Sequence, residues 1–118
     1  MDNPDYGQLA YYERLVLKIK QEIVTGIRQN GDKLPSVREM AKQVKLNPNT
    51  VAKAYKQLEA EGVVEVRPGL GTFVNAIKAS DDQTKERVIL PKFQQLIIEA
   101  KAVGISKEQL QDWLNTHY

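Results

Sequence analysis

Two helix-start signals lie eleven residues apart in the middle of the chain, and this spacing constrains the fold more than any other feature. Ser36 and Glu39 form an S-x-x-E capping box, in which each side chain accepts a hydrogen bond from a free backbone N–H. Asn47 is a favourable N-cap, and Pro48 suits the first helical position because its missing N–H is not needed there. The sequence therefore predicts a helix of about ten residues, a tight turn and a second helix.

Apolar residues recur at helical spacing before and after these signals. Residues 11–28 contain a stripe that predicts an amphipathic helix with one buried side, formed by Tyr12, Leu15, Val16, Ile19, Ile23 and Ile27. The segment QNGDKLP ends this helix, because glycine tolerates positive φ and the residue before proline favours extended backbone. In the next two helices we expect burial of Val37, Met40, Ala41, Val44, Val51, Ala54, Tyr55 and Leu58.

Gly62 closes the third helix, and two short strands follow it. VVEV (63–66) and TFV (72–74) are separated by RPGLG, whose proline and two glycines suit a tight hairpin connection. The predicted fold class is mainly α with a small β-hairpin (α+β), a winged helix-turn-helix. We expect this domain to span residues 1–77.

The outward face of the third helix is polar and basic. At 100° per residue, Asn49, Lys53 and Lys56 point away from the apolar side, with Thr50 at the flank, and the first carboxylate is Glu59. Residues 33–56 contain six cations and one glutamate, although the whole chain has a net charge of only +2. Amides, hydroxyls and ammonium groups contact base edges and phosphates, so we predict double-stranded DNA as the partner.

The composition disfavours several other functions. The 118-residue chain has no cysteine, and its single histidine is residue 117, so thiolate metal sites and catalytic dyads lack the groups they require. We therefore expect no enzyme activity, no metal and no cofactor. There is no long apolar run and no signal-peptide pattern at the N-terminus, so we expect no membrane span and a cytoplasmic protein.

One segment resembles a known family. Residues 31–74, GDKLPSVREMAKQVKLNPNTVAKAYKQLEAEGVVEVRPGLGTFV, are similar to the winged-helix domain of the GntR family of bacterial transcription regulators. LPSVRE, NTVAKAY, LEAEG and GLGTFV stand in the family's order and spacing. The resemblance implies a sequence-specific transcription regulator that acts as a repressor.

The resemblance also implies roles for individual residues. Arg38 would contact DNA backbone or bases, Ser36 would cap its helix and donate to a phosphate, and Gly69 would lie near the minor groove. Asn49, Thr50 and Lys53, at the start of the third helix, would contact the bases. The full predicted DNA-binding set is Ser36, Arg38, Asn47, Asn49, Thr50, Lys53, Lys56, Arg67, Gly69 and Gly71. Many family members have arginine where this chain has Pro48 and Ala52, which bears on the operator sequence rather than on DNA binding.

Residues 78–118 have the pattern of a separate helical segment. Ser80 predicts a cap, Pro91 a kink or a restart, Gly104 a stop, and Ser106 with Gln109 another capping box. The apolar side chains exceed what so short a segment leaves in water, which predicts a C-terminal two-helix dimerisation segment with Phe93, Leu96, Ile97, Leu110, Trp113 and Leu114 at its contact. The alternative is that these residues pack on the first helix.

This C-terminal segment is similar to that of the YtrA subfamily, whose tails are too small for a separate effector-binding domain. The existence of a small-molecule effector stays open. Two other functions compete with a DNA-binding homodimer on a pseudo-palindromic operator. One is a detached winged-helix module of a larger aminotransferase-like regulator, and the other is a winged helix that binds protein. The capped ends of the tail argue against the first, and the cations of residues 33–56 argue against the second.

Overall fold

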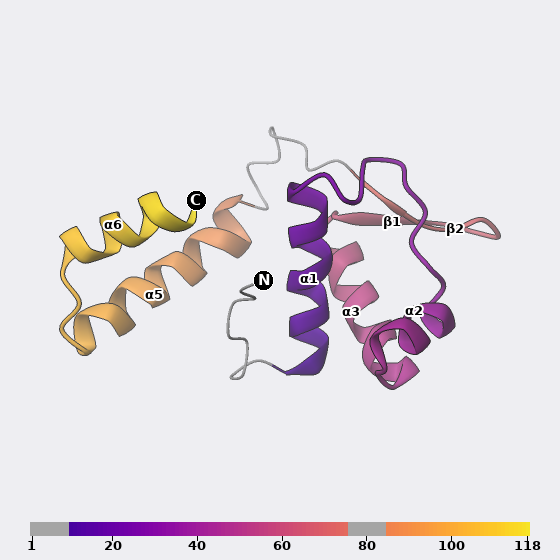
Figure 1. Ribbon diagram of the computed structural model, residues 1–118, viewed down its shortest axis with the longest axis horizontal. Helices are drawn as coiled ribbons and strands as arrows, with labels where there is room; N and C mark the ends of the chain where they lie inside the picture. The colour runs from indigo at the N-terminus through magenta and orange to yellow at the C-terminus, as the bar shows by residue number, and fades with distance from the viewer. Residues whose placement is uncertain (1–9, 76–84) are drawn as a thin grey trace. The chain divides into compact units, whose positions relative to one another are not determined.

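The computed structural model of the chain describes residues 10–75 and 85–118 and divides into two compact units, residues 1–78 and 79–118 (Figure 1). The first unit contains three helices followed by a hairpin, and the second contains a π-helical turn and two α-helices. The elements of the first unit are α1 (Tyr11–Val24), α2 (Val37–Val44), α3 (Pro48–Ala60), β1 (Val64–Arg67) and β2 (Gly71–Val74). Those of the second are η1 (Lys85–Ile89), α5 (Leu90–Ala102) and α6 (Lys107–His117).

Helix α1 is shorter than the apolar stripe predicts. Leu15, Val16 and Ile19 are buried as expected, but the helix ends at Val24. Gly26 follows with φ +83°, a conformation that turns the chain out of the helix. Ile27 is consequently 71% exposed, so its predicted place in the buried stripe is wrong.

The predicted capping box at the start of α2 is confirmed. The Ser36 hydroxyl accepts a hydrogen bond from the Glu39 N–H at 3.1 Å, and the Glu39 carboxylate accepts from the Ser36 N–H at 3.0 Å. These bonds to the backbone and side chain of Ser36 lower the pKa of Glu39. Lys45 ends the helix with φ 56°, a left-handed conformation that permits a short turn before α3.

Helix α3 begins and ends where the sequence predicts. The Asn47 side-chain oxygen accepts from the Asn49 N–H at 2.8 Å, and Pro48 occupies the first turn. Gly62 has φ +75° just beyond the end of the helix. The inner face is buried along its whole length through Val51, Ala54, Tyr55 and Leu58. Together with residues of α1, α2 and the hairpin, these side chains form the core of the first unit.

The hairpin is antiparallel and pairs Val64 with Val74 and Arg67 with Gly71. Strand β1 is displaced by one residue at both ends from the predicted 63–66, and β2 begins one residue before the predicted 72–74. The turn closes with a hydrogen bond from the Leu70 N–H to the Arg67 carbonyl at 2.9 Å, and it requires positive φ at Gly69 (+74°).

The segment between α1 and α2 also pairs with this sheet, along the free edge of β2. Lys33 forms an antiparallel bridge with Phe73, and the Leu34 N–H donates to the Thr72 carbonyl at 2.8 Å. The sequence predicts a helix-breaking connection here and gives no sign of the pairing with β2. A single bridged residue has no period of alternation that a sequence pattern could display.

The second unit follows the predicted punctuation where the structure describes it. Pro91 lies in the first turn of α5, directly after the π-helical turn, so the predicted irregularity at proline is confirmed. Gly104 follows α5 with φ +82°. Half of the predicted capping box is confirmed, since the Ser106 hydroxyl accepts from the Gln109 N–H at 3.1 Å. The predicted cap at Ser80 lies outside the described residues.

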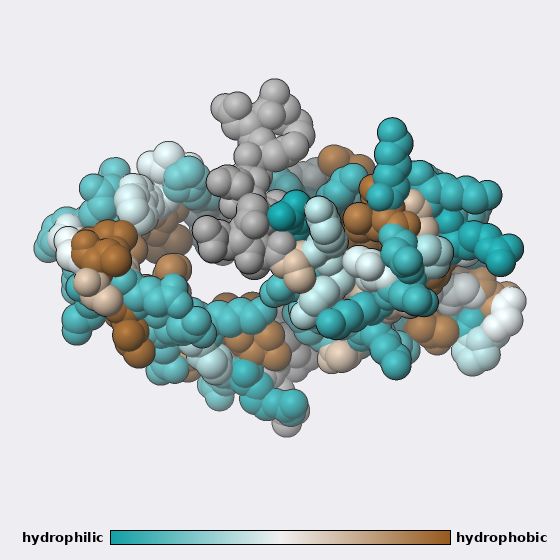
Figure 2. Space-filling view, turned by 90° about the horizontal axis from the view of Figure 1, so that it is seen from below, coloured by the Kyte–Doolittle hydropathy of each residue, from teal (hydrophilic) through white to brown (hydrophobic). Residues whose placement is uncertain are grey.

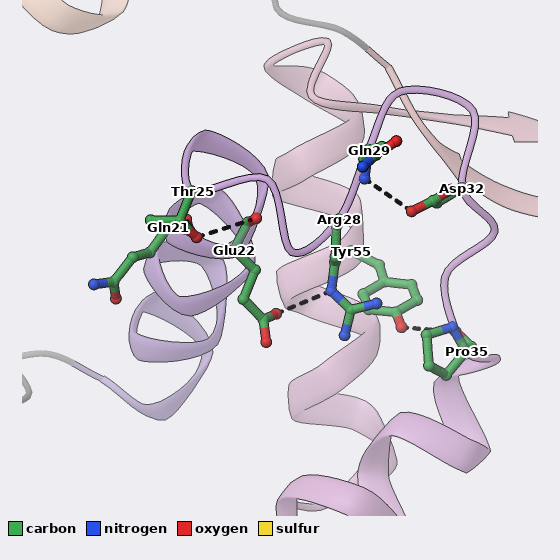
Figure 3. Close-up of polar contacts among 8 residues, drawn as sticks. All are labelled: Gln21, Glu22, Thr25, Arg28, Gln29, Asp32, Pro35 and Tyr55. Atoms are coloured by element: carbon green, nitrogen blue, oxygen red, sulfur yellow. Dashed lines mark hydrogen bonds and ion pairs between the residues drawn. The ribbon is translucent and has the colours of Figure 1, made fainter. Parts of the chain in front are cut away.

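Tyr55 connects α3 to the chain that enters α2. Its hydroxyl donates to the Pro35 carbonyl at 2.7 Å (Figure 3), and burial raises the pKa of Tyr55 to about 12, with the Arg28 guanidinium acting in the opposite direction. The folded protein therefore binds the phenolic proton more tightly than the unfolded chain does. This contribution to stability is complete below pH 10 and is lost as the pH rises towards 12.

We expect Tyr55→Phe to lower the free energy of unfolding near pH 7 by about 1 kcal/mol, because the Pro35 carbonyl loses its donor. The difference between the two proteins should narrow as the pH rises through the window from 10 to 12. Urea unfolding followed by circular dichroism at a series of pH values measures both effects. A difference that stays constant across this window would contradict the assignment.

Candidate nucleic-acid interface

The outer face of α3 presents polar side chains to solvent. Asn49, Lys53 and Lys56 are exposed, and Thr50 is half-buried at the flank of the helix. Glu59, the first carboxylate on this helix, lies two turns or more beyond its start and is also exposed. The amino-terminal half of the outer face therefore has donors and positive charge without an acid.

Glu61, at the end of α3, faces α1. Its carboxylate accepts from the Lys20 ammonium at 2.6 Å and from the Gln57 amide at 2.9 Å. This ion pair joins the end of α3 to the middle of α1 and neutralises Lys20. The Glu61 carboxylate is thus paired within the fold. It points towards α1, away from the side of α3 that presents Asn49 and Lys56.

Lys53 makes a contact that the sequence analysis did not predict. Its ammonium lies 4.1 Å from the centroid of the Tyr12 ring on α1. A cation over an aromatic face is attracted by the ring quadrupole, so Lys53 has a preferred orientation before any partner binds. Tyr12 had been recognised as part of the apolar stripe, and periodicity gave no signal that its ring would lie beneath this lysine.

The predicted residues around α2 lie close to the start of that helix and to the turn before α3. Arg38 is exposed in the first turn of α2. Ser36 and Asn47 are also exposed, and each uses a side-chain oxygen to cap its own helix. The Ser36 hydroxyl hydrogen and the Asn47 amide hydrogens are donors that these capping bonds do not use.

Arg67 is occupied within the hairpin. Its Nε and one Nη donate to the same carboxylate oxygen of Glu65 at 2.9 and 2.7 Å, and its guanidinium lies 4.3 Å from the centroid of the Phe73 ring. The predicted DNA contact of Arg67 stays a prediction, and it would require this pair to open or to share the cation. Glu65 lies two residues before Arg67 on β1 and therefore on the same face of the strand, whereas Phe73, which pairs with Glu65 across the hairpin, could be located only once the register was known.

The two predicted glycines of the wing, the hairpin β1–β2 with its turn, have different surroundings. A Cβ at Gly69 would meet open space, so its positive φ is the feature that favours glycine there. A Cβ at Gly71 would lie 2.7 Å from Cε of Lys33. Gly71 therefore allows the Lys33 side chain to lie across the wing, in addition to adopting φ +128°.

A groove lies between α3 and the wing. Its lining includes Asn49, Lys53 and Lys56 from the helix and Val66 and Thr72 from the strands. The groove brings together predicted contacts on α3 and the base of the wing. A second groove, between α2 and the wing, includes Ser36, Arg67, Gly69 and Gly71, so the remaining predicted residues of the wing border the start of α2.

The predicted dimerisation residues all lie on α5 and α6. Phe93, Leu96, Trp113 and Leu114 are 53%, 54%, 44% and 56% exposed. Ile97 and Leu110 are half-buried, and Ala100 is buried within the second unit. Figure 2 shows apolar side chains on the surface of this unit, at its left side. Four of the six predicted dimerisation residues therefore leave much of their apolar surface exposed.

Within residues 10–75 and 85–118, no cluster of three or more histidine, aspartate or glutamate side chains could bind a metal ion. None of the helices in the same ranges is long and apolar enough to cross a membrane.

Three helices followed by an antiparallel hairpin define a winged helix-turn-helix protein. Residues 11–74 match the family described as bacterial regulatory proteins, gntR family. The chain belongs to the GntR family of transcription regulators, within its YtrA-like subfamily. GntR regulators bind double-stranded DNA, and the prediction of a DNA-binding transcription regulator rather than an enzyme is confirmed at this level.

Similarity to individual proteins extends over most of the chain. The HTH-type transcriptional repressor YtrA of Bacillus subtilis is 42% identical over 104 residues, which cover 87% of this chain and 80% of that protein. A crystal structure described as a transcriptional antiterminator from Listeria monocytogenes has a TM-score of 0.85 and 31% identity, covering 99% of this chain and 88% of that one. YtrA from Sulfolobus acidocaldarius, a GntR-family transcription factor, has a TM-score of 0.57 and 27% identity, covering 98% and 94%.

The contact between Lys53 and Tyr12 predicts a specific response to substitution. Tyr12→Phe keeps the ring and should keep the contact, whereas Tyr12→Leu should lose about 0.5–1 kcal/mol of interaction. In NMR spectra, we expect the Lys53 ε-methylene resonances to be shifted upfield by the ring in the wild type and in Tyr12→Phe, and to return to ordinary values in Tyr12→Leu. Unchanged resonances in the leucine variant would show that the ring does not lie under Lys53.

Proposed function

We propose that the chain is a sequence-specific transcriptional repressor that binds a pseudo-palindromic operator as a homodimer. The single observation that supports this most strongly is the exposed outer face of α3, with Asn49, Lys53 and Lys56 outward and no carboxylate before Glu59. Such a face can enter a major groove by its amino-terminal end without repulsion from the phosphates. In this proposal α3 is the recognition helix.

The other predicted residues would position α3 on the duplex. Arg38 and Ser36 lie at the start of α2, where an arginine fork and a hydroxyl can contact phosphate oxygens. Thr50 and the Asn47 amide lie beside the first turn of α3. In the wing, Arg67, Gly69 and Gly71 would approach the backbone or the minor groove. Contacts to phosphates supply affinity, and contacts from Asn49 and Thr50 to base edges supply selectivity. Lys53 lies on the same face of α3, and its ammonium can bind a phosphate or a base edge.

The exposed apolar surface of α5 and α6 supports a homodimer. Four of its large side chains, including Phe93 and Trp113, are more than two-fifths exposed, and the unit they belong to has about forty residues. A segment of this size gains stability by burying such a surface against a second copy, and twofold dimers are the commonest oligomers. Two recognition helices would then contact half-sites about 34 Å apart, one turn of duplex, or a multiple of this distance.

Two further parts of the proposal concern regulation and location. The repressor assignment draws on the similarity to the Bacillus subtilis protein YtrA, which is a transcriptional repressor. We place the chain in the cytoplasm, where its DNA would be. Any small-molecule effector is unidentified, and the proposal does not require one.

Lys53 offers a direct test of DNA binding. We expect Lys53→Ala to weaken binding to every duplex and to reduce the slope of log K against log salt by about one, if the ammonium contacts a phosphate. Gel-shift titrations at several salt concentrations, with a duplex that the wild type has selected from a random pool, measure the slope. Lys18→Ala, which removes an exposed lysine of α1 outside both grooves, is the matched control. A slope equal to that of the control would show that Lys53 does not contact a phosphate of the DNA backbone.

A substitution in the apolar surface tests the dimer. Leu96→Glu should convert the protein to a monomer by light scattering and remove tight binding to the selected duplex, because a charge would be buried at the contact. Ile27→Glu is the matched control, since Ile27 is 71% exposed in the first unit and is not part of the predicted contact. A dimeric mass and undiminished affinity for Leu96→Glu would contradict dimerisation through this surface.

A further inference from the structure

Lys33 belongs to the wing, although it precedes α2 in the sequence. It bridges to Phe73 of β2, and the neighbouring Leu34 N–H donates to the Thr72 carbonyl at 2.8 Å. Directly paired residues of antiparallel strands place their side chains on the same face of a sheet. Lys33 therefore shares a face with Phe73 and, two residues along β2, with Gly71.

The missing side chain of Gly71 leaves room for the stem of Lys33. A Cβ built at Gly71 would lie 2.7 Å from Cε, 3.6 Å from Cδ and 3.5 Å from Nζ of Lys33. The lysine thus extends along the wing towards the hairpin turn, with its ammonium beside the first residue of β2. A stem that lies against the backbone loses less conformational freedom when the ammonium binds a partner than a freely extended lysine would lose.

Two cations, Arg67 and Lys33, lie at the wing, and they differ in whether they are paired with a carboxylate. Arg67 already donates twice to Glu65 and stacks on Phe73. Lys33 is exposed, and within residues 10–75 and 85–118 no ion pair with it is seen. The pKa of the nearby Glu39 carboxylate is lowered by its bonds to Ser36 and also by the charge of Lys33, but no ion pair between Glu39 and Lys33 is seen in the described residues. Of the two cations, Lys33 is therefore the one that is not held in an ion pair.

We propose that Lys33 is a further DNA-contacting residue, which binds a backbone phosphate beside the wing from its position across Gly71. This inference rests on the proposed function and adds a residue outside the set predicted from sequence. A phosphate is the expected target because an ammonium is a compact point charge on a stem fixed along the strand, which suits a backbone oxygen better than the patterned edge of a base.

The test uses the full chain, a duplex selected by the wild type from a random pool, and an unselected duplex of the same length. Lys33→Met keeps the stem and removes the charge, whereas Lys33→Arg keeps the charge. We expect Lys33→Met to reduce the salt slope by about one on both duplexes and Lys33→Arg to restore it. Lys18→Met, which removes an exposed lysine of α1, is the control for total charge. Thermal unfolding establishes that each variant is folded.

Two results would overturn the inference. One is a Lys33→Met slope equal to that of Lys18→Met, and the other is a loss confined to the selected duplex, which would indicate contact with bases instead of the backbone. If the proposed function is wrong, the result differs, because the wild type itself would then select no duplex from the random pool. Suppose instead that the wild type binds the duplex, with Lys53→Ala lowering the salt slope and Lys33→Met leaving it unchanged. That result refutes the contact of Lys33 and leaves the proposed function in place.

Discussion

The burial of the inner face of α3 determines which residues of this protein can contact a partner. Val51, Ala54 and Leu58 have no exposed surface, and Tyr55 is tied by its hydroxyl to the Pro35 carbonyl. A helix fixed on that side has no freedom to rotate about its axis, since rotation would expose these side chains to water and open the packed core. The opposite side, with Asn49 and Lys56, is therefore exposed by necessity.

Burial fixes the rotation of α3 about its axis, and the cap at its start fixes where the helix begins. Asn47 ends the turn after α2 and begins α3 with a hydrogen bond to the Asn49 N–H. The free N–H groups of the first turn, the positive end of the helix dipole and the side chains of Asn49 and Thr50 consequently lie at one end of the recognition helix. The carboxylates of Glu59 and Glu61 lie at the other end, where they complement neither a phosphate nor a base acceptor.

Local signals made the helices and the hairpin predictable, whereas contacts between distant residues were not. The capping box of Ser36, the Asn47–Pro48 start and the Gly62 stop each act within a few residues, so the sequence alone located α2 and α3. Ile27 was misplaced because periodicity continues past Gly26, where the backbone leaves the helix. The contacts of Lys53 with Tyr12 and of Lys33 with Gly71 join residues about forty apart, and their geometry depends on packing that no local pattern records.

Contacts between distant residues also explain why the net charge of the chain is a poor guide to the charge on its DNA-binding face. The chain has a net charge of only +2, yet in the first unit Lys20, Arg28 and Arg67 pair with Glu61, Glu22 and Glu65. These pairs remove a cation of α1, one of the segment that follows α1 and one of the hairpin from the charge offered to a partner. The positive charge that remains exposed includes Arg38 and Lys42 on α2 and Lys53 and Lys56 on α3. Ion pairing within the first unit therefore leaves positive charge on the two helices of the helix-turn-helix, where a polyanion can bind it.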